Sequence, residues 1–319
     1  MIKADKYILE TIEDILENGS WDKDPRPRWS DGAPAHSKFI TQAVFKYDIS
    51  KEEFPITTLR KTALKGAYYD IEAIYQKQTN VIEEMHSSIH SWWEDFVVES
   101  WEEEKISITS KFDWEYYLTG RTLNSLGQTY GHTVKRYKLI DNLLYGLESS
   151  PFSRRHIMNL WDNKQMEEDK QALVPCAYQT LWSVREKYEV YEEDKHIPYS
   201  EPVHYIDITL NQRSQDFMMT ASINPAQYIM LGMMVCGHLT HTTGITHKLG
   251  NFLHIVQNCH IYNRHIPAAK ELLKRESINE QPTVRLKENK NFYDYTIDDF
   301  EFNIPKGIKN LPEKLELAV

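Results

Sequence analysis

The chain has 319 residues, of which 41% are hydrophobic and 12% aromatic, and its formal net charge at pH 7 is −10. This length and composition suit a large packed core. The negative charge argues against a protein that grips a nucleic-acid polymer through a general basic field. The charged N-terminus is unlike a signal peptide, and no apolar run reaches the length of a membrane span.

Three cysteines, Cys176, Cys236 and Cys259, are odd in number and far apart. They fit neither a zinc spacing nor a disulfide framework, which is typical of a reducing cytoplasm. Thirteen histidines include His238, His241 and His247, which lie close together without a carboxylate or cysteine at a ligand spacing. We therefore expect a cytoplasmic protein with no metal ion and no membrane partner.

The first 150 residues predict helices around one strand and one loop. Apolar residues fall on one helical face over residues 8–16, and residues 21–36 form a proline-rich loop that carries Arg26. Residues 37–49 alternate like a strand. Residues 62–78 and 133–149 predict helices. Acidic and aromatic residues over 83–117 show no clear period, and we expect a mostly helical insertion near 98–125.

The second half predicts most of the sheet. "RRHIMNLW", "CAYQTLWSV" and "VHYIDITLNQRS" read as three strands, with residues 185–202 as a long hairpin tip. A buried helix covers 224–243, a strand begins at 251, a helix covers 265–276, and residues 292–302 predict a strand pair. Because strands and helices interleave without a regular βαβ repeat, this order favours an α+β fold.

Polar clusters follow several of these elements. "LNQRSQDF" places Gln212, Arg213, Ser214 and Asp216 at a strand end, which suits an anion or carbonyl, although a polar turn is the simpler alternative. The tandem Arg154 and Arg155 suit a phosphate, but exposed paired arginines are common.

Three further positions carry possible chemistry. His260 and Tyr262 share a strand face and could bind a sugar hydroxyl, or they are polar tips of a half-buried strand. Asn224 opens the buried helix and could read a base edge, or it is an ordinary N-cap. Cys176 follows a proline in an apolar run and is either a nucleophile or a packing residue.

The order of these motifs resembles that of thymidylate synthases and the related pyrimidine nucleotide hydroxymethylases. "PC" at 175–176, "QRS-D" at 212–216, "N…QY" at 224–228 and "H-Y" at 260–262 carry this resemblance. "DGAPAH", "SRRHI" and "FYDYTIDDF" are similar to members from Bacillus and its bacterial viruses. The resemblance covers most of the chain. It implies one domain over 1–319, with a large twisted mixed sheet, flanking helices, and a homodimer in which two sheets pack back to back.

The resemblance also implies roles for single residues. Cys176 would attack carbon 6 of dUMP, so that carbon 5 can accept a one-carbon unit from 5,10-methylenetetrahydrofolate. Arg213 beside the thiol is expected to lower its pKa. The remaining expected roles are phosphate binding by Arg26, Arg213, Ser214 and, across the dimer, Arg154 and Arg155; further substrate binding by Gln212; uracil recognition by Asn224; ribose binding by His260 and Tyr262; proton removal assisted by Tyr130; and folate contacts by Trp93, Asp216 and Val319.

Several positions depart from the synthase pattern. Asp70 stands where synthases place a catalytic glutamate, with Glu72 as the alternative register, and residues 219–224 replace a folate-side loop. An aspartate is shorter than a glutamate by about 1.5 Å, which leaves room for a water molecule beside the reacting carbon. This favours a dUMP hydroxymethylase. Thymidylate synthase is the close alternative because the tail Leu317–Val319 is similar to the synthase tail, and a non-catalytic nucleotide-binding relative is the third.

Overall fold

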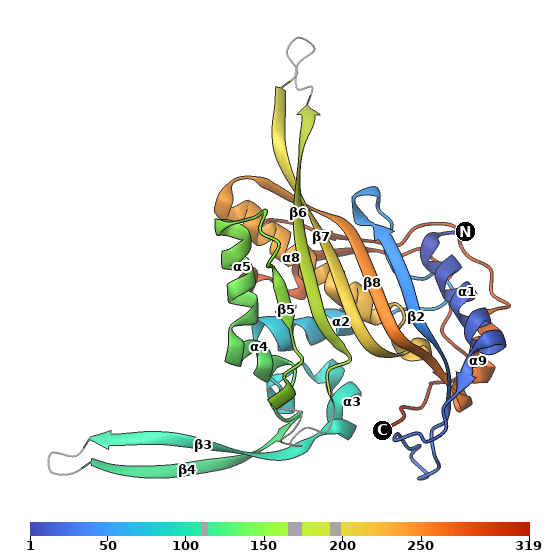
Figure 1. The fold of residues 1–319 in the computed structure, drawn as a ribbon, viewed down its shortest axis with the longest axis horizontal. Coiled ribbons are helices and arrows are strands. Elements are labelled where there is room, and N and C mark those ends of the chain that lie inside the picture. The colour runs from blue at the N-terminus through green and yellow to red at the C-terminus, as the bar shows by residue number, and fades with distance from the viewer. Residues whose placement is uncertain (110–113, 165–173, 192–198) are drawn as a thin grey trace.

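The computed structural model describes residues 1–109, 114–164, 174–191 and 199–319. Its centre is a six-stranded sheet in the order β1-β2-β8-β7-β6-β5 (Figure 1). Only the β7–β8 pair is parallel among these described strands, and the other pairs are antiparallel. The predicted α+β fold with a large mixed sheet is therefore confirmed. The strands are β1 (Ser20–Trp21), β2 (Ser37–Asp48), β5 (Ile157–Asn159), β6 (Ala177–Tyr191), β7 (Tyr199–Asp216) and β8 (Thr246–Tyr262).

One long helix, α8 (Ile223–Thr243), makes the parallel pairing possible. Parallel strands need a crossover connection, and α8 supplies it between β7 and β8. It packs on the inner face of the sheet against Ile206, Ile208 and Leu210, none more than 1% exposed. A Cβ atom at Gly232 would come within 2.6 Å of Ile208 Cδ1, so only glycine lets the helix lie this close to the strand.

Shorter helices cover the edges of the sheet and the inner face beside α8 (Figure 1). α1 buries Ile8, Ile12 and Ile15, as the apolar face in the sequence predicts. None of the described helices is both long and apolar enough to cross a bilayer. These helices are α1 (Lys3–Asn18), α2 (Leu64–Ile71), α3 (His90–Trp93), α4 (Gly131–Tyr137), α5 (Leu139–Ser149), α7 (Phe217–Thr220) and α9 (Ile266–Leu272); α2 continues as a π-helical segment, η2 (Glu72–Gln76).

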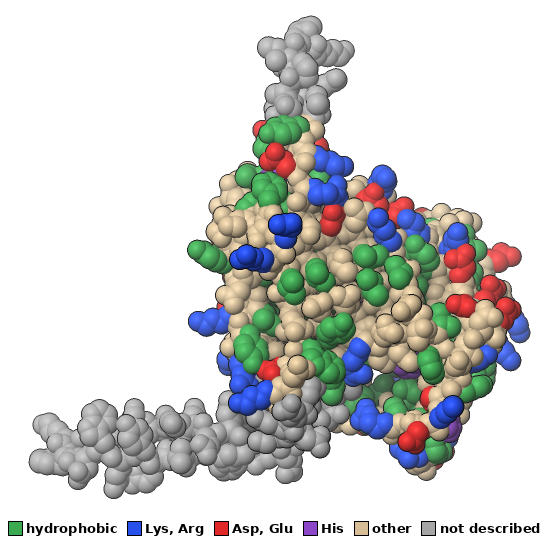
Figure 2. All heavy atoms as spheres, in the orientation of Figure 1, with side chains coloured by type: hydrophobic (Ala, Val, Ile, Leu, Met, Phe, Trp, Pro, Cys, Tyr) green, Lys and Arg blue, Asp and Glu red, His purple; other side chains and the backbone are tan. Residues whose placement is uncertain are grey.

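The opposite face of the sheet carries exposed apolar side chains. Val44 on β2 is 54% exposed and Ile157 on β5 is 47% exposed, while Leu181, Leu253 and Ile255 are half-buried. Figure 2 shows hydrophobic side chains spread over the middle of this face. The sheet therefore has one face covered by helices and one face that, within this chain, meets solvent.

The predicted helical insertion at 98–125 is wrong. β3 (Val98–Thr109) and β4 (Trp114–Ser125) pair antiparallel from Val98 with Ser125 to Thr109 with Trp114. This ribbon extends away from the body of the protein (Figure 1). The segment is rich in β-branched and aromatic residues, which favour strands, but its many acidic residues hid the two-residue period.

The predicted strand pair at 292–302 is also mostly wrong. It consists of the 3-10 turns η7 (Phe292–Asp294) and η8 (Ile297–Asp299), followed by the short strand β10 (Phe300–Asn303), which pairs with β9 (Thr283–Leu286). Local capping explains the turns: the Asn291 side chain accepts a hydrogen bond from the Tyr293 amide, and Thr296 and Asp299 form a capping box.

Candidate active site

Two cavities of about 550 and 560 Å³ adjoin near the ends of β6, β7 and β8. The first is largely apolar, and its walls include Ile71, Ile74, Trp92 and Leu315. The second, called the polar cavity below, has a larger polar share, with walls that include Arg26, Arg213, Ser214, Asp216, His260 and Tyr262. Seven residues line both cavities: Trp93, Tyr130, Cys176, Met219, Thr220, Asn224 and Leu317. The site therefore has room for two ligands that meet at these shared residues.

Cys176 lies in a bend immediately before β6, and Arg213 holds this bend in place. The Arg213 guanidinium donates to the carbonyls of Pro175 (3.0 Å) and Val174 (2.8 Å), and its Nη2 lies 3.7 Å from Cys176 Sγ. Burial raises the pKa of the Cys176 thiol, while Arg213 and Arg26 act in the opposite direction without cancelling it. The expected net lowering of the pKa is therefore wrong, although Arg213 contributes with the expected sign.

Tyr130 contacts the backbone of Cys176. Its hydroxyl accepts a hydrogen bond from the Cys176 amide at 3.2 Å, and its ring packs edge-on against Trp93. Its backbone is in the sparsely populated region with φ +44°, and Gly131 follows it against the backbone of Thr79, where a Cβ would lie 2.1 Å from an oxygen. Such strain is typical of residues held for function.

The polar cavity gathers most of the residues that the sequence singled out. Asp22 binds the amide and hydroxyl of Ser37 at 2.7 and 2.8 Å, and so ties down the loop that carries Arg26. His260 Nδ1 lies 3.0 Å from Asn258 Oδ1, and its ring packs against Tyr262. Burial lowers the pKa of His260, so this imidazole is neutral near pH 7. Asp216 lines this polar cavity and caps α7, whereas a place on the folate side was expected.

A chain of side-chain amides crosses the boundary between the cavities. His254 Nε2 lies 2.8 Å from Gln212 Oε1, and Gln212 Nε2 lies 3.5 Å from Asn224 Oδ1. Asn224 Nδ2 donates to Gln227 Oε1 at 3.2 Å, and Gln227 Nε2 donates to Asp70 Oδ2 at 2.6 Å. This series of hydrogen bonds, called the amide chain below, connects the start of α8 to α2 through side chains that are wholly or largely buried.

Asp70 ends this chain in the wall of the apolar cavity. Its second oxygen accepts from Trp93 Nε1 at 2.7 Å, and the residue is only 5% exposed. Burial raises the pKa of Asp70 to about 7, against the lowering effect of the hydrogen bonds from Trp93 and Gln227. Glu72 is not among the cavity-lining residues described and pairs with Lys77 at 2.8 Å. The geometry therefore favours Asp70 over Glu72 as the site carboxylate.

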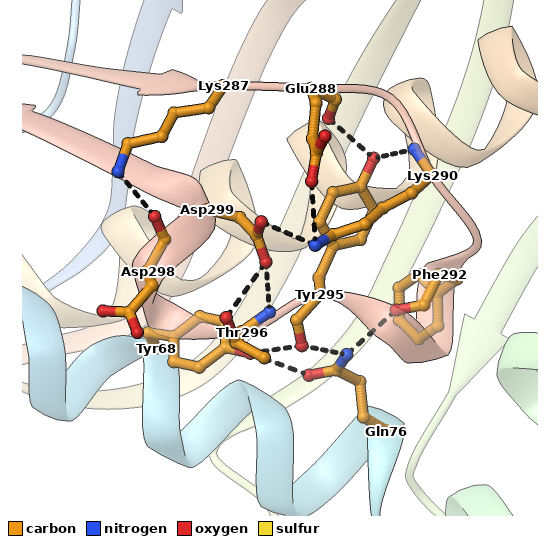
Figure 3. Close-up of polar contacts among 10 residues, drawn as sticks. All are labelled: Tyr68, Gln76, Lys287, Glu288, Lys290, Phe292, Tyr295, Thr296, Asp298 and Asp299. Carbon is orange, nitrogen blue, oxygen red and sulfur yellow. Dashed lines mark hydrogen bonds and ion pairs between the residues drawn. The ribbon is translucent and has the colours of Figure 1, made fainter.

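The helix that carries Asp70 is anchored on both sides of it (Figure 3). Tyr68 donates to the Tyr295 carbonyl at 2.8 Å, and Gln76 donates to the carbonyls of Phe292 and Tyr295 at 2.9 and 3.0 Å. The loop that supplies these carbonyls is itself held by Lys290, which pairs with Asp299 at 2.6 Å. π-Helical turns such as η2 are frequent at functional sites, and here the turn ends at the anchor residue Gln76.

The C-terminal segment lies along both cavities. Leu317 lines both, and Ala318 lines the polar one and packs against Trp29. Val319 pairs with Arg28 through two backbone hydrogen bonds of 2.5 and 3.0 Å and does not itself line either cavity. The tail thus joins the loop that carries Arg26.

Like Val319, the predicted site residues Arg154 and Arg155 do not line either of these cavities. Both are exposed in the turn before β5. Conversely, sequence reasoning missed Gln227 and His254. Gln227 lies three residues after Asn224 on one helix, a spacing that places two side chains on the same face and could have identified it.

Comparison with known proteins agrees with this geometry. Residues 6–308 match the family described as thymidylate synthase. The chain is 38% identical to thymidylate synthase of Streptococcus pneumoniae (strain 70585) and 37% identical to that of Streptococcus thermophilus (strain CNRZ 1066), over 94% of each chain. The thermostable thymidylate synthase A from Bacillus subtilis superposes with a TM-score of 0.74, at 28% identity and 99% coverage of both chains. The protein belongs to the thymidylate synthase family.

Proposed function

We propose that the protein is a thymidylate synthase, which converts dUMP to dTMP with 5,10-methylenetetrahydrofolate as the one-carbon donor. The observation that carries the proposal is the place of Cys176, whose thiol lies in the common wall of a polar and an apolar cavity. A nucleophile at this junction can activate a ring bound in one cavity toward a partner bound in the other.

The polar cavity has the groups that a pyrimidine nucleotide needs. Arg26, Arg213 and Ser214 can hold a phosphate, because guanidinium groups bind its oxygens in pairs. His260 and Tyr262 can bind the ribose hydroxyl, and Asn224 can pair with the uracil edge beside Cys176. Arg213 has a double role, since it also stabilises the thiolate form of Cys176.

The apolar cavity fits the folate. Ile71, Ile74, Trp92, Trp93 and Leu315 form walls suited to a flat fused ring, and Asp70 offers a buried polar contact among them. When bound, the folate supplies the one-carbon unit and the reducing hydride. Among the protein's own groups, the Tyr130 hydroxyl, which accepts from the Cys176 amide, can assist proton removal from carbon 5 of dUMP.

Methylation now has more support than the hydroxymethylation that the short Asp70 side chain suggested. That expectation required free space next to the carboxylate. Instead, Gln227 Nε2 lies 2.6 Å from Asp70 Oδ2, so an amide takes up the space beside the shorter acid. The streptococcal and Bacillus relatives are also named thymidylate synthases. The names support methylation, and the Gln227 contact supports a site that keeps water away from the reacting carbon.

We further propose that two copies pack through the open faces of their sheets. The exposed Val44 and Ile157, together with the half-buried Leu181, Leu253 and Ile255, give this face the apolar character of a subunit interface. Arg154 and Arg155 are exposed and outside the cavities of their own chain. A second copy would bring them to the phosphate end of its partner's site.

Product analysis tests the reaction. The protein is incubated with dUMP and 5,10-methylenetetrahydrofolate, the nucleotide product is weighed by mass spectrometry, and dihydrofolate is followed by its absorbance. We expect dTMP and dihydrofolate in equal amounts. A product heavier by one oxygen atom, without dihydrofolate, would instead identify a hydroxymethylase.

Cys176→Ser should abolish both products while dUMP still binds, because an alcohol is a far weaker nucleophile near neutral pH. If the unaltered protein shows no turnover, the third alternative, a non-catalytic nucleotide-binding relative, would be favoured.

A further inference from the structure

We propose that Gln227 and His254 are positioning residues that hold the amide of Asn224 in one orientation, and that the ionisation of Asp70 controls this orientation through Gln227. The inference rests on the proposal that the polar cavity binds a uracil nucleotide. It concerns which of two ends Asn224 presents to the base, and therefore how the site tells uracil from cytosine.

The direction of the amide chain is set at its Gln212 end by a group that can only accept. Gln212 Nε2 lies 2.9 Å from the carbonyl oxygen of Ser214, so the NH2 group of Gln212 must face that carbonyl. Gln212 Oε1 then accepts from His254 Nε2 at 2.8 Å. Burial lowers the pKa of His254 to about 3, so this ring is neutral and carries its proton on Nε2. His254 therefore locks the direction of Gln212.

The other end is set by the ionised carboxylate of Asp70, which also can only accept. Gln227 must direct its NH2 group at Asp70 (2.6 Å) and its oxygen at Asn224 Nδ2 (3.2 Å). Asn224 Oδ1 consequently faces Gln212 Nε2, at 3.5 Å the longest contact in the chain. Both ends impose the same orientation on Asn224.

This orientation matters because a free amide could read either pyrimidine. Uracil presents an acceptor at O4 and a donor at N3, whereas cytosine presents a donor at N4 and an acceptor at N3. An asparagine pairs with one base in one orientation and with the other base after a half-turn of its amide. An amide held from both sides pairs with one base only and leaves buried polar groups unpaired against the other.

Protonation of Asp70 removes one of the two constraints. A neutral carboxyl group can donate to Gln227 Oε1, so Gln227 can turn and no longer fixes Asn224. Burial raises the pKa of Asp70 to about 7, so this change falls near neutral pH. The other titratable or charged groups around Asp70 and in its cavity are Tyr75, Tyr130, Tyr228, Cys176, Glu94, Asp95, Lys314 and Glu316.

The first test uses the unaltered protein and equilibrium binding, without turnover. Dissociation constants for dUMP and dCMP are measured by calorimetry from about pH 6 to about pH 8. The phosphate ionises alike in both nucleotides, so its effect cancels in the ratio of the two constants. We expect the preference for dUMP to fall about three- to tenfold as the pH drops through the pKa of Asp70. A ratio that does not change with pH would overturn the coupling while leaving dUMP binding, and hence the proposed function, intact.

Variants then test separately the two ends of the amide chain that runs from His254 to Asp70. Gln227→Leu should lose most of the preference for dUMP at the higher pH and should show no pH step. His254→Phe should lower the preference at every pH but keep the step, and His254→Gln should restore it because a side-chain donor returns at similar reach. Tyr75→Phe is the matched control: it removes a buried 3.2 Å contact with Tyr228 that is not part of the amide chain, and it should change neither the preference for dUMP nor the pH step.

A Gln227→Leu protein that keeps both the preference and the step would show that another group sets the orientation of Asn224. Failure of dUMP to bind the unaltered protein would overturn this inference and the proposed function together.

Discussion

At the scale of single residues, Asp70 combines burial with two short hydrogen bonds. Trp93 and Gln227 each donate to one of its oxygens, and these bonds favour the charged form. Burial opposes them and dominates, so the pKa stands at about 7 against an ordinary value of 3.8. The protein therefore retains a carboxyl group whose charged form destabilises the fold, which is typical of a group kept for function.

This residue makes a testable contribution to stability. Because the folded pKa lies above the unfolded one, the native state binds more protons between about pH 4 and about pH 7, and the Asp70 contribution to stability improves as the pH falls through 7. Three pKa units correspond to at most about 4 kcal/mol. We expect Asp70→Asn to be more stable than the unaltered protein near pH 8, with the difference shrinking or reversing near pH 5. Denaturant unfolding of both proteins at matched pH measures this difference in the free energy of unfolding. A difference that does not change with pH would show that Asp70 does not titrate in this range.

The sequence predicted the residues of this site better than their connections. Cys176, Arg213, Asn224, His260 and Tyr262 sit in motifs, and the structure brings all five to the two adjoining cavities. Gln227 could not be given a role, because its partner Asp70 is 157 positions away on another helix. The net direction of the shift in the Cys176 pKa was also not predicted. Charges can be read from residue types, whereas desolvation depends on packing.

At the scale of elements, strands with a buried face were predictable and the protruding ribbon was not. β7 and β8 alternate because one face packs under α8, so their sequences carry the two-residue period. β3 and β4 form a separate two-stranded sheet, and no such constraint shaped their pattern. The turns at 292–299 were missed because local caps overrode the strand propensity of their aromatic residues.

The separate pairing of β3 and β4 predicts that the ribbon is dispensable for folding. Replacing residues 100–123 with a short glycine-containing turn should leave the melting temperature within about 4 °C of the original. The bridge between Val81 and Ser125 and the pairing of Val98 with Ser125 remain in this variant. A much larger loss in thermal denaturation would mean that the ribbon supports the core.

At the scale of the whole molecule, the C-terminal tail meets the loop that follows Arg26 beside the site. Glu316 accepts from the Ser30 amide at 2.9 Å and pairs with Arg264 at 2.9 Å, while Arg264 also pairs with Asp31 at 2.6 Å. The buried His265 donates to the Glu316 carbonyl at 2.9 Å. These contacts fix the tail to the loop that follows Arg26. The tail position therefore depends on residues that are distant in sequence.

Glu316→Gln should weaken the contacts between the tail and the loop that follows Arg26. The variant keeps the size of the side chain but loses its charge, so Asp31 is the carboxylate that still pairs with Arg264. We expect backbone amides of 313–319 to exchange with deuterium on the order of fivefold faster, an effect that high salt should mimic in the unaltered protein. Glu313→Gln, the same change at an exposed tail position, is the control and should leave exchange unchanged. Equal exchange in all three proteins would show that backbone contacts alone hold the tail.

The proposed dimer makes the last prediction, because a shared site can be rebuilt from two defective chains. Cys176→Ser removes the nucleophile of its own site, whereas the double variant Arg154→Ala and Arg155→Ala would damage only the phosphate site of the partner. In a heterodimer one site then carries both defects and the other carries neither. Equal mixing gives heterodimers in half of the molecules, so activity at low dUMP should recover to about a quarter of the original. Subunit exchange must be confirmed by a tag on one chain. If exchange occurs and activity does not return, Arg154 and Arg155 do not serve a partner's site.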